Sequence, residues 1–314
     1  MASHGETPHT PMDDPDTGHL PGAGADDRAD WEPARSGGRV LQPGITLAAT
    51  PLGNIGDATD RLRAALGEAD VIAAEDTRRA RQLAAALGVE IRGRVVSNFD
   101  HNEEGRARQL LDAARSGVVL VVTDAGMPLV SDPGFSLVDA AHTAGVPVTC
   151  LPGPSAVPTA LALSGLPVGR FLFDGFAPRK SGARREWLES LRTEERAVCF
   201  FESPHRLAET LGVAAEVLGT TRRAAVCREL TKTYEEVRRG TLPELAEWAA
   251  AGVKGEITVV IEGGVPDEAD VAALVPVVES LVAEGMRLKD ACRDVAAGRG
   301  VSNRELYEAV LAAR

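Results

Sequence analysis

Residues 118–134 have the sequence Val-Val-Leu-Val-Val-Thr-Asp-Ala-Gly-Met-Pro-Leu-Val-Ser-Asp-Pro-Gly. The five aliphatic residues 118–122 predict a buried strand. The loop that follows ends like the start of a helix, with Ser131 or Asp132 as the cap and Pro133 in the first turn. Capping does not explain the segment Asp124–Pro128, and ligands of open α/β sheets bind beyond the carboxyl ends of strands. We therefore predict that this loop binds a ligand, whose chemistry these residues alone leave open.

The same alternation of strands and helices is predicted on both sides of this loop. Short β-branched or aliphatic runs predict strands at 45–49, 71–74, 94–97, 118–123 and 148–150. Stretches of helical period between them predict helices near 57–66, 78–87, 103–116 and 135–144. Such alternation is typical of a mostly parallel sheet with helices on both faces.

The proline-rich segment Leu151–Ser155 interrupts this rhythm and predicts a hinge between two α/β units. In the second unit we predict strands at 171–174, 197–201, 224–228, 234–240 and 256–261, and helices at 184–191, 205–218 and 242–251. No helix separates the two strands between residues 224 and 240. The second sheet is therefore predicted to be mixed.

The end of the chain is predicted to be helical. Segments 288–297 and 303–313 have helical period, a glycine-containing turn joins them, and Ser302 and Glu305 have the spacing of a capping box. This pair is either a packing module or a helix-turn-helix that contacts nucleic acid. We predict four parts: a disordered tail at 1–43, an N-terminal α/β domain at 44–154, a C-terminal α/β domain at 155–264 and a helical module at 265–314.

Composition excludes several classes of protein. Of the 314 residues, 44% are hydrophobic and 25% charged, which is ordinary for globular domains, and no unbroken apolar stretch is long enough to span a membrane. The first 40 residues lack the apolar core of a secretory signal, so we expect the protein in the cytoplasm. Four separated cysteines and scattered histidines predict reduced thiols and no bound metal.

Three further loops behind predicted strands carry polar residues. Thr50–Asp57 lacks the G-x-G-x-x-G spacing of a pyrophosphate site, which argues against a dinucleotide. Glu75–Arg78 and Glu202–Arg206 combine acids with residues that also serve as helix caps, and Glu229–Thr233 carries a Glu and a Lys. Each segment has a structural explanation by itself. Their recurrence at strand ends predicts one shared site.

With these segments in order, the chain resembles the tetrapyrrole methylase fold family, and within it the branch that methylates ribosomal RNA of the small subunit. The resemblance extends from about Gly44 to Gly263, and the helical end resembles that branch's appendage. Its motifs are Ala49–Asn54, Ile72–Arg78, Asp100–Glu103, Thr123–Gly134, Leu151–Ser155, Phe201–Arg206 and Arg228–Thr233. Together and in this order they are highly specific.

The resemblance implies that S-adenosylmethionine binds in the crevice between the two α/β units, that no metal is needed, and that the protein is a homodimer. It implies that the donor is held mainly by backbone groups of the strand-end loops. The residues carried over are Pro51, Gly53, Asn54, Asp124, Ala125, Gly126, Met127, Pro128, Asp132, Pro152, Gly153, Pro154, Ser155 and Ala156.

The reaction implied is methyl transfer to the ribose 2′-hydroxyl of a cytidine in the decoding centre of 16S rRNA. The candidates for the general base are Asp76, Glu202, His205 and Lys232, and a lysine would have to be neutral to accept a proton. The net charge of −12 fits RNA binding poorly, so we predict local basic patches. Their residues are Arg78, Arg79, Arg179, Lys180, Arg184 and Arg185.

The chain departs from the branch at two positions. Phe99 stands where the branch usually has His, so no catalytic role is carried over there, and Met127 replaces a usual Thr, which removes a hydroxyl contact. Two alternatives remain open. One is a tetrapyrrole (precorrin) C-methyltransferase of the same fold, which would need neither the helical end nor the basic segment 179–185. The other is a DNA-binding regulator that uses the C-terminal helices.

Overall fold

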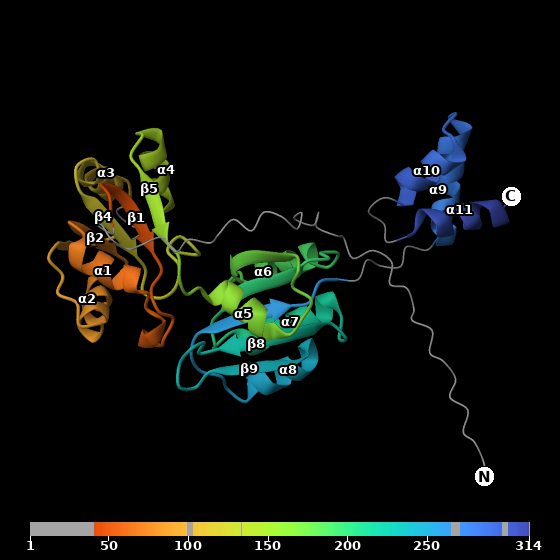
Figure 1. Cartoon of the computed structure of the whole chain (residues 1–314). Helices are drawn as coiled ribbons and strands as arrows, with labels where there is room; N and C mark the ends of the chain where they lie inside the picture. Colours follow the sequence, from red (N-terminus) through yellow and green to blue (C-terminus); the bar gives the residue numbers. More distant parts are fainter. Residues whose placement is uncertain (1–40, 99–102, 133, 265–270, 297–300, 314) are drawn as a thin grey trace, which may run out of the picture. The chain divides into compact units, whose positions relative to one another are not determined.

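We describe the protein from a computed structural model (Figure 1). The structure describes residues 41–98, 103–132, 134–264, 271–296 and 301–313. Residues 1–40 of the predicted disordered tail lie outside the described residues, as do Phe99 and most of the Asp100–Glu103 motif. The prediction for the tail and the limits of the four predicted parts therefore stay predictions.

The first sheet consists of five parallel strands in the order β3-β2-β4-β1-β5. Its strands are β1 (Gly44–Ala48), β2 (Val71–Ala74), β3 (Arg94–Ser97), β4 (Val118–Val122) and β5 (Val148–Leu151). All five residues of β4, which lies between β2 and β1, are buried, as its run of aliphatic residues predicts. The predicted parallel sheet is confirmed.

Helices cover both faces of this sheet. α1 (Asp60–Glu68) and α2 (Thr77–Ala86) pack on one face, and α3 (Glu103–Ala114) and α4 (Phe135–Thr143) pack on the other. Right-handed crossovers explain this, because the chain moves toward β3 after β1 and β2 but toward β5 after β3 and β4. The loops that leave the neighbouring strands β1 and β4 therefore diverge to opposite faces, and this is where open α/β sheets bind ligands.

The second sheet is mixed, with the order β6-β7-β10-β8-β9. Its strands are β6 (Phe171–Phe176), β7 (Ala197–Glu202), β8 (Arg223–Arg228), β9 (Glu236–Thr241) and β10 (Ile257–Ile261). β6 and β7 are parallel, whereas β10 is antiparallel to β7 and β8, and β9 is antiparallel to β8. α6 (Ser181–Ser190), α7 (Leu207–Leu218) and α8 (Leu242–Ala250) pack on one face. The prediction of a mixed sheet is confirmed.

Two α-helices were missing from the sequence prediction, and α1 begins three residues later than predicted. α5 (Ala156–Ser164), which packs on the other face of the second sheet, and α9 (Val271–Ala283) each contain a proline. Pro158 is tolerated because it lies in the first turn of α5, where backbone N–H groups lack a helical partner anyway. The helix predicted from residue 57 begins at Asp60, because Thr59 caps it by accepting a hydrogen bond from Leu62 N.

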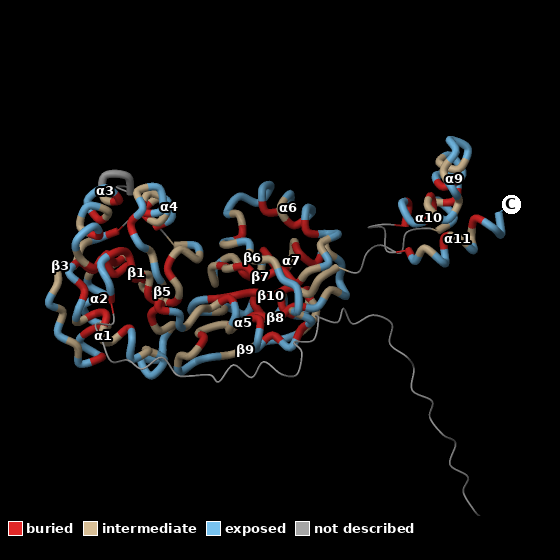
Figure 2. Tube along the Cα trace, turned by 45° about the horizontal axis from the view of Figure 1, so that its top comes forward, coloured by how far each residue is buried: buried red, intermediate tan, exposed pale blue. Residues whose placement is uncertain are grey.

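The C-terminal helices α9, α10 (Leu288–Ala296) and α11 (Asn303–Ala312) have a hydrophobic core of their own. Ser302 caps α11, because its hydroxyl accepts a hydrogen bond from Glu305 N at 3.0 Å. Figure 2 shows that buried residues concentrate on the strands and on the inner sides of the helices that cover them. None of the helices in the described part of the chain combines the length and apolar character of a membrane-spanning helix.

Candidate active site

The loops that follow β1 and β4 are joined by backbone hydrogen bonds. Thr50 N donates to Gly126 O at 2.9 Å, and Gly126 N donates to Thr50 O at 3.0 Å. The hydroxyl of Thr50 also donates to Thr123 O at 3.2 Å. Gly126 has a φ of +84°, a left-handed conformation that glycine adopts without a steric cost. The two loops thus form one unit at the carboxyl ends of their strands.

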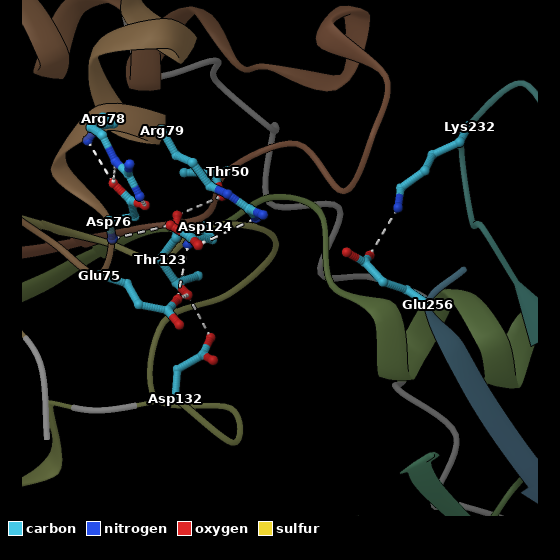
Figure 3. A network of polar contacts seen from close by, with 10 residues as sticks. All are labelled: Thr50, Glu75, Asp76, Arg78, Arg79, Thr123, Asp124, Asp132, Lys232 and Glu256. Atoms are coloured by element: carbon cyan, nitrogen blue, oxygen red, sulfur yellow. Dashed lines mark hydrogen bonds and ion pairs between the residues drawn. The ribbon is translucent and has the colours of Figure 1, made fainter. Parts of the chain in front are cut away.

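Thr123, the first residue after β4, contacts two carboxylates with a single hydroxyl group (Figure 3). Its Oγ1 lies 2.7 Å from Glu75 Oε2 and 2.7 Å from Asp132 Oδ2. A hydroxyl has one hydrogen and can donate it to only one of the two carboxylates at a time. Glu75 Oε2 also accepts a hydrogen bond from Asp124 N at 3.2 Å. The hydroxyl of Thr123 thus joins two acidic side chains at the carboxyl end of the first sheet.

Asp124 and Asp76 are both aspartates at strand ends, but their surroundings differ. Asp124 Oδ1 accepts a hydrogen bond from Asp76 N at 3.1 Å, and Asp124 Oδ2 lies 3.3 Å from Arg79 Nη1. Burial raises the pKa of Asp124, and the negative charge of Glu75 adds to this shift. Hydrogen bonds from Arg78 instead lower the pKa of Asp76 to about 2. Asp76 is therefore an ionised cap of α2 at neutral pH.

A cavity of about 450 Å³ lies next to these groups. Its size is within the range of about 300–1,000 Å³ that is usual for small-molecule sites. Residues from both α/β halves line it: Leu52, Glu75, Arg79, Thr123, Asp124, Ala125, Gly126, Met127, Val130, Ser131, Asp132, Ser155, Ala156, Phe176, Phe201, Glu202, Ser203, Pro204, Leu230, Gly255, Glu256, Ile257 and Thr258.

The loops after β1 and β8 approach each other closely beside this cavity. Asn54 N donates a hydrogen bond to Thr231 Oγ1 at 3.1 Å. A Cβ atom on Gly53 would lie only 2.1 Å from Lys232 Cγ, so a larger residue would force the lysine side chain to move. In the described part of the chain, the four non-glycine residues with positive φ lie in the two loops 124–132 and 229–232, and they are Leu129, Ser131, Glu229 and Thr231. Backbone strain of this kind, about 1–3 kcal/mol for each residue, concentrates at functional sites.

The structure places half of the predicted cofactor-binding residues at this cavity. The residues that line it are Asp124, Ala125, Gly126, Met127, Asp132, Ser155 and Ala156. Those absent from its lining are Pro51, Gly53, Asn54, Pro128, Pro152, Gly153 and Pro154. Leu52 lies in the wall instead of its neighbours, while the side chain of Asn54 accepts a hydrogen bond from Gly56 N. No described contact shows which of these residues holds a ligand, so their role stays a prediction.

Of the four candidates for the general base, only Glu202 lines the cavity. Its buried carboxylate accepts hydrogen bonds from Ser203 N and Thr210 Oγ1, both at 2.6 Å, and lies 2.5 Å from Arg206 Nη2. His205 is exposed and its side chain is not part of the wall. Asp76 is also absent from the lining and is held by Arg78.

Lys232, another candidate for the base, is held by two carboxylates. Burial by itself would lower the pKa of Lys232, but hydrogen bonds to Glu229 and Glu256 outweigh that effect and raise it. The two contacts measure 2.9 Å to Glu229 Oε1 and 3.1 Å to Glu256 Oε2, the second of which is drawn in Figure 3. A protonated ammonium has no lone pair, so Lys232 would first have to lose a proton to act as a base, and this role stays a prediction.

The predicted RNA-binding cations divide into buried, paired and exposed ones. Arg184 is only 1% exposed and its Nη2 is within ion-pair distance of Glu209, although none of its N–H groups is aligned for a hydrogen bond. It is not available to a phosphate, so we remove it from the predicted patch. Arg185 pairs with Glu216, Arg78 pairs with Asp76, and Arg79 pairs with Asp124. Arg179 and Lys180 are exposed.

Three residues of the site received no individual role in the sequence prediction. Glu75 and Thr123 follow the adjacent strands β2 and β4, and Glu256 precedes β10. Their positions at strand ends were the available signal, but only the pairing of β2 with β4 brings Glu75 to Thr123. Within the described ranges, no three His, Cys, Asp or Glu side chains form a group that could hold a metal ion.

Comparison with known proteins defines the class of this protein. The profile of the family described as Tetrapyrrole (Corrin/Porphyrin) Methylases matches residues 44–246, and the chain belongs to this family. Solved structures with this fold include a cobalt precorrin-4 methyltransferase (TM-score 0.53, 18% identity, 69% of this chain and 93% of that chain) and a diphthine synthase (TM-score 0.53, 18% identity, 69% and 89%). These likenesses confirm the predicted fold.

Curated relatives indicate the branch of the family to which the chain is similar. A protein of Mycobacterium tuberculosis H37Rv named Ribosomal RNA small subunit methyltransferase I is 59% identical over 281 residues, which cover 89% of this chain and 96% of the relative. A protein of the same name from Escherichia coli O157:H7 is 38% identical over 271 residues, covering 85% and 94%. The resemblance to the small-subunit RNA branch is thereby confirmed, and neither a precorrin C-methyltransferase nor a DNA-binding regulator is favoured.

Proposed function

We propose that this protein transfers a methyl group from S-adenosylmethionine to the ribose 2′-hydroxyl of a decoding-centre cytidine in 16S rRNA. The single observation that carries the proposal is the extent of similarity to curated small-subunit RNA methyltransferases, at 59% identity over 89% of the chain. We assign this activity to the cavity at the carboxyl ends of β1, β2 and β4.

The chemistry of the cavity fits this donor. S-adenosylmethionine has a positively charged sulfonium and a positively charged ammonium group, and opposite charges close by favour binding in a partly enclosed site. Five carboxylates and one guanidinium line the cavity: Glu75, Asp124, Asp132, Glu202, Glu256 and Arg79. Gly126 and Ala125 keep one wall free of large side chains, so a ligand can reach the backbone there.

The chain's own residues position the reactants and receive a proton. The bound donor supplies an electrophilic methyl group, and alignment of the attacking hydroxyl with it can lower the barrier by about 7–11 kcal/mol. Removal of the hydroxyl proton by a positioned base contributes about 10²–10⁴-fold. Of the four residues predicted as candidates for this base, Glu202 is the one that lines the cavity, and we propose it as the acceptor of the proton.

Arg79 takes a different role from the one predicted from sequence. Its guanidinium lines the cavity and pairs with Asp124, so we propose that it positions Asp124 against the donor. The exposed cations Arg179 and Lys180 remain as the phosphate-binding candidates. We further propose that the protein acts as a homodimer on the small ribosomal subunit in the cytoplasm, as the family resemblance implies.

Methyl transfer in solution tests the proposal directly. Purified protein is incubated with S-adenosylmethionine labelled on the methyl group and with small ribosomal subunits from cells that lack this protein. The expected result is one labelled 2′-O-methylcytidine per subunit, found by nucleoside analysis of the RNA. Label that enters only a precorrin offered in parallel would favour the tetrapyrrole alternative and contradict the proposal.

A further inference from the structure

Phe176 is a large apolar side chain that the proposed chemistry does not use. It is 60% exposed, although it lies at the end of β6 and lines the cavity. An exposed aromatic ring in the wall of a cavity offers a flat, apolar surface to whatever enters. The local backbone of β6 explains why the ring lies in the wall of the cavity.

An irregularity in β6 sets the direction of this side chain. Phe173 pairs with Cys199, and Phe176 pairs with Phe201, so three steps along β6 match two along β7. The extra residue is a β-bulge, which reverses the alternation of side chains and brings Phe176 to the same face as Phe173. Gly175, with a φ of +68°, supplies the left-handed backbone that the bulge needs. In a regular strand Phe176 would point to the opposite face.

Neighbouring rings fix the orientation of Phe176. Its ring packs edge to face on Phe201, with centroids 5.3 Å apart and planes at 61°. Phe201 is held in turn by Phe173 at 5.1 Å and 65°. A ring held in this way loses little conformational entropy when a ligand stacks on it, which strengthens binding.

Two exposed, positively charged side chains lie shortly after Phe176 in the sequence. Arg179 and Lys180 lie three and four positions further on and are exposed. The loop that carries them is attached to the site, because Arg206 donates to Ala177 O at 3.4 Å and pairs with the buried Glu202. Exposed aromatic rings and cations are the groups with which proteins bind single-stranded RNA, whose bases stack on the rings while the cations neutralise its phosphates.

We propose that Phe176 is the stacking surface for the unpaired pyrimidine base of the nucleotide that is methylated, with Arg179 and Lys180 on the adjacent phosphates. The inference rests on the proposed function, since it assigns an RNA subsite to the same cavity. Stacking there holds the ribose at the cavity while the base remains outside the donor's part of the site. Phe176 thereby determines how tightly RNA binds and leaves donor binding unaffected.

The test compares Phe176→Ala, Phe176→Leu and Phe176→Trp with a matched control, Phe171→Ala. Phe171 lies at the other end of β6, is about half exposed and does not line the cavity. We expect Phe176→Ala and Phe176→Leu to raise the KM for small subunits about 5- to 150-fold, because a stacked base contributes about 1–3 kcal/mol. Phe176→Trp keeps a flat ring and should restore a KM near that of the wild type.

Calorimetry and light scattering complete the test. The Kd for S-adenosylmethionine and the oligomeric state should be the same in all variants. Equal KM values for subunits in Phe176→Ala and Phe171→Ala would overturn the inference, as would a loss of donor affinity or a change of oligomeric state in Phe176→Ala, which would place the ring in the donor site or in an interface. Failure of the wild type to methylate subunits would instead overturn the proposed function.

Discussion

The hydroxyl of Thr123 lies within hydrogen-bond distance of two carboxylates of the site, and its removal provides the first prediction. Thr123→Val keeps the shape of the side chain but leaves Glu75 and Asp132 facing an apolar group. We expect the free energy of unfolding to fall by about 0.5–1.5 kcal/mol, because the buried Thr123 side chain loses a hydrogen bond to a carboxylate. Urea denaturation measures this change.

Thr46 provides a matched control for this substitution. It lies in β1, is fully buried, and its hydroxyl has no hydrogen-bond partner in the described structure. Thr46→Val removes an unsatisfied polar atom, so we expect it to be neutral or stabilising. Equal losses of stability in the two variants would contradict the role assigned to Thr123.

Asp76 gives a prediction of pH dependence. Its pKa in the folded protein is about 2, below the ordinary value of 3.8, so its ionised form stabilises the fold above pH 3.8. This stabilisation is lost as the pH falls toward 2. Asp76→Asn still caps α2 but removes the charge, and it should lower the melting temperature at pH 7 with a difference that vanishes near pH 2. Replacement of a general base lowers the reaction rate about 10²–10⁴-fold, and we expect no such loss of the methyl-transfer rate in Asp76→Asn.

At the scale of single residues, the position of the site was easier to predict from the sequence than the roles of its residues. The loop Asp124–Met127 lies at the cavity as expected from its position behind β4. The environment of a charge depends on partners distant in sequence, and no spacing revealed that Arg184 on α6 would be buried against Glu209 on α7. The protonation state of Lys232 depends likewise on Glu256, which the sheet brings to it.

At the scale of elements, Gly126 connects the loops after β1 and β4, and a larger residue should separate them. A Cβ atom there would lie 3.1 Å from Leu52 Cδ2, on a backbone with a φ of +84°. We expect Gly126→Ala to lose about 1–2 kcal/mol of stability from the left-handed backbone and to weaken donor binding about tenfold or more. Calorimetry with S-adenosylmethionine measures the second effect.

Gly145 separates backbone strain from the effect on the site. It has a similar φ of +66°, and a Cβ atom added to it would meet nothing within 4 Å. Gly145→Ala should therefore lose similar stability but keep the donor affinity of the wild type. Weakened donor binding in both variants would show that the loss reflects general destabilisation and not the contact between the two loops.

Helices and strands with a clear hydrophobic periodicity were predictable from the sequence, whereas helices that contain proline were not. The buried strands β2 and β4 follow from aliphatic runs, and their parallel pairing follows from the helices between strands. Helix α5 was hidden by Pro158 and by the proline-rich segment before it, and α9 by Pro276. The bulge in β6 was equally hidden, because Gly175 alone does not distinguish a bulge from a weak strand.

At the scale of the whole molecule, the C-terminal helices should be separable from donor binding. Buried residues of α9, α10 and α11 belong to a core that contains no residue of either sheet. A chain that ends at Gly264 should therefore keep its Kd for S-adenosylmethionine and the melting temperature of the α/β units. Loss of donor binding on this truncation would contradict the assignment of the site to the loops of the two sheets.

The most direct test of the proposed activity is a map of ribose methylation in 16S rRNA from cells that lack this protein. Wild-type cells, the deletion strain and the deletion strain with the gene restored are compared by mass spectrometry of RNA fragments. We predict that a single 2′-O-methylcytidine of the decoding centre disappears on deletion and returns with the wild-type gene. An unchanged methylation map would contradict the account.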